Sequence, residues 1–66
     1  RNNKNYTMTY VFIFATLFSG LIHEIEVTGF QTKETCQVYA GVTLGAFSQA
    51  GHKILEAECV PIEKEA

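Results

Sequence analysis

A long apolar segment near the start of the chain constrains its fold more than any other feature. Residues 8–22, MTYVFIFATLFSGLI, carry no charged side chain, whereas all seven acidic residues lie from Glu24 onward. A segment that is apolar on every side is buried in protein, inserted in lipid or removed from the working molecule. These three alternatives imply three different classes of protein.

The first alternative is a membrane-spanning helix, and the length of the segment argues against it. A span needs roughly 20 mainly apolar residues to cross about 30 Å of hydrocarbon. Residues 8–22 would cover only about 22 Å as a helix. Glu24 and Glu26 follow, and a charge buried in mid-bilayer costs at least about 2.5 kcal/mol. A small single-pass membrane subunit of a larger complex, with a helix over residues 6–25, is kept as the alternative prediction.

The second alternative is a secretory signal peptide. Such a peptide has an apolar region of about 7 to 15 residues, a more polar stretch and small residues at the cleavage site. Residues 11–22, residues 23–26 and Val27-Thr28-Gly29 supply these in order. We predict a helical signal peptide over residues 8–29, cut between Gly29 and Phe30. Residues 1–7 then lie upstream of a start at Met8, or they supply a basic n-region.

The third alternative is a core element of a soluble domain. Residues 9–14 are rich in β-branched and aromatic side chains, and periodicity alone does not exclude a buried strand. However, the rest of the chain holds little hydrophobic surface with which to cover a run that is apolar all round. The signal peptide is therefore the favoured interpretation.

The predicted mature segment, residues 30–66, is short for a folded domain. Chains below about 40 residues seldom fold alone without disulfides, metal or oligomerisation. Cys36 and Cys59 are the only cysteines, and export would place them in an oxidising compartment. A disulfide between them is the expected staple; in a cytosolic protein they would instead be free thiols.

The pattern after Phe30 predicts a β-rich module. Residues 35–39 and 42–44 favour extended structure, and residues 53–60 predict a third strand, with a helix over residues 53–58 as the competitor. Pro61 is expected to end regular structure. The fold class is thus a small β-rich, disulfide-stapled module preceded by a hydrophobic helical signal segment. The apolar groups best suited to core or contact are Tyr39, Phe47, Ile54 and Leu55.

No residue pattern in the chain predicts catalysis or a cofactor. His52 has no close second histidine and no C-x-x-C partner, so its surroundings do not resemble a zinc site. Glu56 and Glu58 would share one face of a strand, where such pairs usually serve solubility. A net charge of −2 without a Lys/Arg cluster gives no support for nucleic-acid binding.

The stretch C-Q-V-Y-A-G-V-T-L from Cys36, followed by E-C at Cys59, resembles the opening of the single-domain von Willebrand factor type C fold. That group includes tick salivary proteins and scorpion venom peptides. The resemblance places Cys36, Gly41 and Leu44 in a short β-hairpin and implies a secreted protein of salivary, venom or immune type. It covers residues 36–59, and the family carries more cysteines than this chain.

We therefore expect a secreted, extracellular and non-enzymatic polypeptide without cofactor that binds an extracellular protein of unknown identity. Membrane contact is expected only through residues 8–29.

Overall fold

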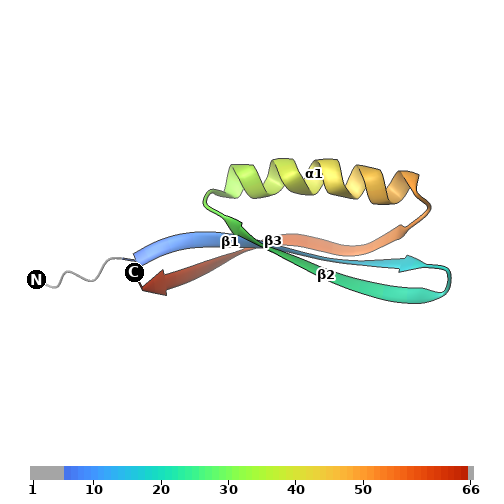
Figure 1. Ribbon diagram of the computed structural model, residues 1–66, viewed down its shortest axis with the longest axis horizontal. Helices are drawn as coiled ribbons and strands as arrows, with labels where there is room; N and C mark the ends of the chain where they lie inside the picture. Colours follow the sequence, from blue (N-terminus) through green and yellow to red (C-terminus); the bar gives the residue numbers. More distant parts are fainter. Residues whose placement is uncertain (1–5, 66) are drawn as a thin grey trace, which may run out of the picture.

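Three strands and one helix make up the part of the chain that the structure, a computed structural model, describes (Figure 1). It covers residues 6–65, with side chains for residues 8–63. The strands are β1 (Tyr6–Phe18), β2 (Leu21–Phe30) and β3 (Lys53–Glu65), and α1 (Lys33–Gln49) joins β2 to β3. The prediction for residues 1–7 falls outside the described side chains.

The sheet has β1 at its centre. The strand order is β2-β1-β3, and β1 pairs antiparallel with both neighbours. β2 and β3 therefore run parallel to each other, one on each side of β1, and α1 makes the crossover between them. The helix lies along one face of the sheet (Figure 1), and no other described element lies over the opposite face.

The central position of β1 explains its apolar composition. Phe12, Phe14 and Thr16 are buried on the face that packs against α1, which we call the covered face. The alternate residues of β1 point to the other side, because successive side chains of a strand face opposite ways. These residues, which are only partly exposed, are Val11, Ile13, Ala15 and Leu17. A central strand is thus apolar on both faces, and we call the second one the open face.

The predicted helix over residues 8–29 is not what the structure shows. These residues form β1, a two-residue turn and β2. Ser19 and Gly20 have φ values of 52° and 75°, and positive φ at both central residues is the condition for a type I′ hairpin turn. The β-branched and aromatic residues of this segment suit a half-buried pleated surface. The third alternative, a core strand, therefore describes its conformation.

The helix α1 replaces the extended segments predicted at residues 35–39 and 42–44. Thr32 caps it, because the Thr32 Oγ1 accepts a hydrogen bond of 3.1 Å from the Thr35 backbone N–H. The helix places one residue per turn toward the sheet, at the positions Cys36, Ala40, Leu44 and Phe47. The β-hairpin that the family resemblance implied is absent, because Cys36, Gly41 and Leu44 all lie on α1. The resemblance itself stays a prediction.

The predicted third strand is confirmed as β3, and it is longer than expected. It continues through Pro61, which lies opposite Tyr10. Because β3 is an edge strand, the missing N–H of the proline can face away from the sheet without breaking the ladder. The helix considered for residues 53–58 is not formed. The coarse prediction of a small, β-rich, disulfide-linked fold is correct.

Candidate functional site

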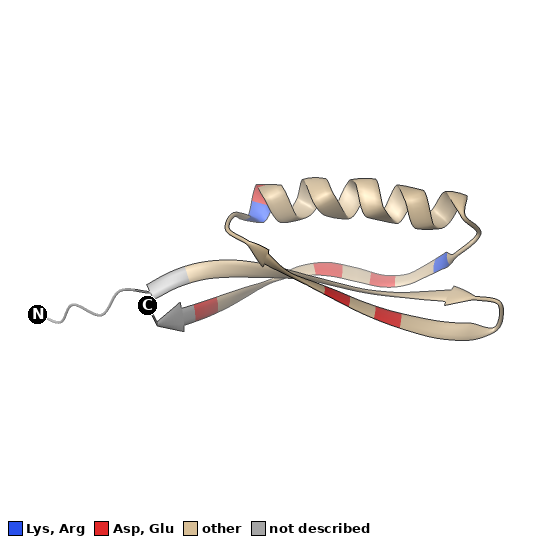
Figure 2. Cartoon of the chain, in the orientation of Figure 1, with Lys and Arg blue, Asp and Glu red and all other residues tan. Residues whose placement is uncertain are grey.

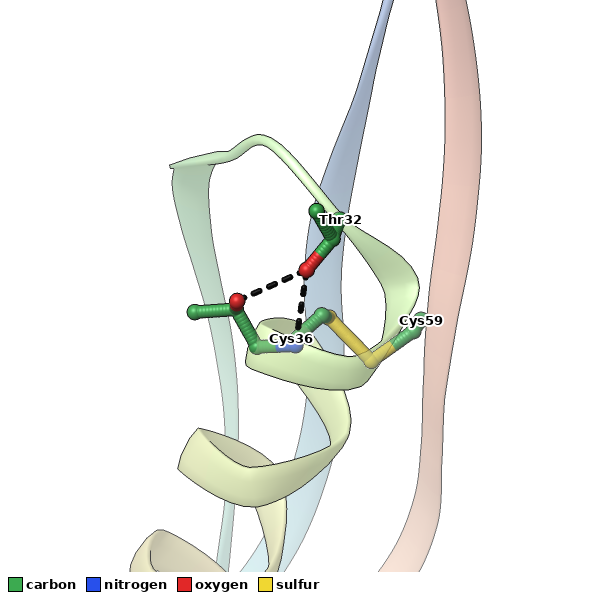
Figure 3. The surroundings of a disulfide bond; sticks show 4 residues. Thr32, Cys36 and Cys59 are labelled. Atoms are coloured by element: carbon green, nitrogen blue, oxygen red, sulfur yellow. Dashed lines mark hydrogen bonds between the residues drawn. A yellow bond between two sulfur atoms is a disulfide. The ribbon is translucent and has the colours of Figure 1, made fainter.

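The predicted disulfide joins the helix to the sheet. Cys36 in the first turn of α1 is bonded to Cys59 on β3, with the two Cα atoms 6.3 Å apart, and Figure 3 shows the bond beside the Thr32 cap. Cys36 is fully buried and belongs to the core cluster with Phe12 and Phe14. Closing a loop of this length stabilises the fold by about 3 kcal/mol in the chain-entropy model. The bond holds the crossover helix onto an edge strand.

The four residues predicted as core or contact lie in different surroundings. Phe47 packs against the core cluster, and its ring meets Phe14 edge to face at 5.1 Å. Tyr39 is 41% exposed, yet its ring still contacts Phe12 and Phe30. Ile54 is half-buried and Leu55 is exposed. Tyr39 and Phe47 belong to α1, whereas Ile54 and Leu55 belong to β3.

The His52 side chain contacts the core at the hairpin end of the sheet. Its Nδ1 lies 2.8 Å from the hydroxyl of buried Thr16, and its ring stacks on Phe18 with centroids 4.2 Å apart. A second histidine, His23, lies 5.8 Å away between ring centroids. Among the described residues, no group of three or more His, Cys, Asp and Glu is arranged to hold a metal. Both histidine rings lie near Phe18 at the hairpin end of the sheet.

The open face of the sheet combines an uncovered apolar line with acidic residues on both sides. Its central line is the apolar face of β1, and the strand register sets an acidic residue on each side of that line. Ala15 lies between Glu24 of β2 and Glu56 of β3. Ile13 lies between Glu26 and Glu58 in the same way. Each of these four carboxylates is exposed.

Glu24 and Glu26 on β2 form one acidic column, and Glu56 and Glu58 on β3 form a second. The central strand β1 lies between the two columns, so two inter-strand spacings separate them. Neighbouring strands lie about 4.8 Å apart, so the columns on β2 and β3 are about 10 Å from each other. A shallow groove of about 220 Å³ lies here, lined in part by Ile13, Ala15, Glu24, Glu26 and Glu56. Figure 2 shows the acidic residues on both outer strands with uncharged β1 between them.

Apolar residues extend the open face beyond the glutamates at both ends. At the hairpin end, Leu17 pairs with Ile22, which is 64% exposed. At the other end, Val11 pairs with Val60, and Thr9 pairs with Ile62, which is 41% exposed. An uncovered apolar line with acidic flanks therefore runs along the sheet.

Among the side chains that the structure describes, cations are scarce near this surface. Only Lys33 and Lys53, among the five basic residues, have described side chains. Lys53 pairs with Leu17 at the hairpin end of the open face. Lys33 begins α1 and lines a second groove, between the helix and β3, that also reaches Glu58. Four of the seven acidic residues thus gather on one face, with one described lysine at its end.

Sequence reasoning found half of this surface. The spacing of Glu56 and Glu58 placed them on one face of a strand, but Glu24 and Glu26 were assigned to the discarded signal peptide. The signal that could have found them is the alternation I-H-E-I-E-V of residues 22–27, which is typical of a strand with one buried face. Their meeting with Glu56 and Glu58 depends on a register between segments far apart in the sequence.

Comparison with protein-family models, curated proteins and solved structures finds no match to this chain. Among the described residues, no helix has the length and apolar character needed to cross a membrane. The segment considered for that role, residues 6–25, lies in β1, the turn and β2.

Proposed function

We propose that this chain is a non-enzymatic extracellular protein that binds another extracellular protein through the open face of its sheet. The observation that carries the proposal is the open face itself. An apolar line on a central strand is normally covered in a folded domain, and here α1 covers only the other side. Exposed apolar surface bordered by polar groups is typical of protein–protein contact.

The extracellular assignment draws on the disulfide between Cys36 and Cys59. Disulfides persist in oxidising compartments and are rare in the cytosol. Secretion is therefore part of the proposal, and the disulfide supports it. A role as a salivary, venom or immune effector would be one form of such binding.

In this proposal residues 8–29 stay in the working protein. Phe12 and Phe14 are 0% and 1% exposed and form the centre of the core. Cleavage after Gly29 would remove β1 and nearly all of β2, and it would leave α1 and β3 without the central strand of the sheet. Signal cleavage after Gly29 stays a prediction. It is an alternative to this proposal, because a mature molecule either retains residues 8–29 or has lost them.

Site-specific photo-crosslinking tests the binding surface. A photoreactive residue replaces Leu17 on the open face, and a matched variant carries it at Val42, which is 71% exposed on the outer side of α1. Each disulfide-bonded protein is irradiated in extracellular fluid from its source. The proposal expects one defined crosslinked protein from position 17 and none from position 42. Equal products from both positions, or none from position 17, would contradict it.

A further inference from the structure

We propose that the partner presents a basic amphipathic helix to the open face. This inference rests on the proposed function, because it names the chemistry of the partner that the same surface would bind. Glu24, Glu26, Glu56 and Glu58 border an apolar line, so a complementary surface has an apolar centre with cations on both sides.

The dimensions of the open face suit a helix. Val11 and Leu17 are six positions apart on β1, which corresponds to about 20 Å at 3.4 Å per residue. A helix of about 14 residues has that length, and its diameter of about 10 to 12 Å matches the separation of the two acidic columns. Its apolar stripe would lie on Ile13 and Ala15. Lysine or arginine residues on its flanks would reach the glutamates.

Charge selects against other occupants. A second copy of the chain would set its own four glutamates against these four if two open faces met, and like charges facing each other in an interface are unfavourable. Nucleic acid and anionic lipid would be repelled for the same reason. A cationic segment is the occupant whose charge complements the face.

The size of the surface predicts modest affinity. A strip about 20 Å long and about 10 to 12 Å wide gives a contact area of the order of 200 Å² on this side, well below the roughly 800 Å² per partner of a standard stable interface. We expect micromolar binding that weakens as salt is added, because the charges are exposed and screened. The binding energy would be shared between the apolar line and the acidic columns.

A synthetic 14-residue helical peptide provides the probe, with leucines on one face and lysines on both flanks. Its binding to the disulfide-bonded protein is measured by fluorescence anisotropy at low salt. Two comparator peptides keep the length: one has glutamate in place of lysine, and one has the leucines and lysines in scrambled order. The inference expects binding of the first peptide only.

Matched variants locate the binding site. Glu24→Gln with Glu56→Gln removes two charges that flank Ala15, whereas Glu34→Gln with Glu63→Gln removes two charges elsewhere. Ion pairs at exposed sites contribute modestly, so we expect the first double variant to bind about 5- to 10-fold more weakly. The second should bind as the unaltered protein does. Circular dichroism verifies that both variants remain folded.

Three results would overturn the inference: no binding of the lysine peptide to folded protein, equal loss in both double variants, or equal binding of the scrambled peptide. These failures differ from failure of the proposed function. A defined crosslink from Leu17 without peptide binding would refute the basic helix and keep the binding surface. Absence of that crosslink would refute the proposed function, whatever the peptide does.

Discussion

Replacing Phe14 with alanine is expected to cost the protein a third or more of its stability. Phe14 is 1% exposed, stacks on Phe12 with ring centroids 4.7 Å apart and meets Phe47 edge to face. Truncating a buried phenylalanine to alanine costs about 3 to 5 kcal/mol through lost burial and the cavity left behind. A domain of this size has a total stability of roughly 3 to 10 kcal/mol. Phe14→Ala therefore removes a third or more of the total.

Phe18 provides the matched control on the same strand. Its side chain is 38% exposed at the hairpin end, where it stacks on His52. Phe18→Ala removes less buried surface and leaves no enclosed cavity, so we expect a loss of about 1 kcal/mol. The same residue type is thus changed four positions apart on one strand, once at a buried and once at a partly exposed position.

Urea unfolding followed by circular dichroism measures both variants with the disulfide intact. The linear extrapolation gives the free energy of unfolding, and the slope reports whether the same surface is exposed. We expect Phe14→Ala to lower the unfolding free energy by at least 2 kcal/mol more than Phe18→Ala. Equal effects, or no effect of either substitution, would mean that β1 does not form the core described above.

Three further predictions concern contacts around the helix and the hairpin end. Replacing both Cys36 and Cys59 with serine should lower the unfolding free energy by about 3 kcal/mol, measured by urea unfolding; an unchanged midpoint would contradict a stapling role. Thr32→Ala removes the helix cap and should cost about 1 kcal/mol, with loss of hydrogen-exchange protection confined to the first turn of α1; protection that stays the same would refute the cap. Thr16→Val removes the hydroxyl that lies 2.8 Å from His52 Nδ1 and should cost about 1 kcal/mol, seen as a lower urea midpoint; a higher midpoint would show that the hydrogen bond contributes less than the added methyl group.

The disulfide between Cys36 and Cys59 and the last strand were predicted correctly from the sequence. The helix predicted over residues 8–29 was wrong, because these residues form β1 and β2. Residues 8–22 are apolar on every side, and a central strand, a signal peptide and a short membrane helix share that property. The distinction depends on what covers the segment. In this chain the cover comes from α1, whose inward side is formed by Cys36, Ala40, Leu44 and Phe47.

The helix was missed because its local preferences oppose it. Val38, Val42 and Thr43 are β-branched, and Gly41 and Gly45 are the weakest ordinary helix formers. Packing of one side against the sheet and the disulfide at Cys36 outweigh these preferences. The spacing of the four inward residues was the available signal, since it repeats every three to four positions.

The open face could not be predicted from sequence spacing alone. Glu24 and Glu56 are separated by 32 positions, and they flank Ala15 only because β1 pairs with β2 on one side and with β3 on the other. A slip of one residue in either pairing would move the acidic column to the covered face. The surface is therefore a property of the register.

Intact-mass spectrometry of the protein secreted by its source, before and after reduction, tests the central claim most directly. The claim is that residues 8–29 belong to a disulfide-linked extracellular fold. It predicts a species that contains residues 8–29, verified by fragmentation, and that gains the mass of two hydrogens on reduction of Cys36 and Cys59. A mature species that begins at Phe30, or one whose mass does not change on reduction, would contradict it.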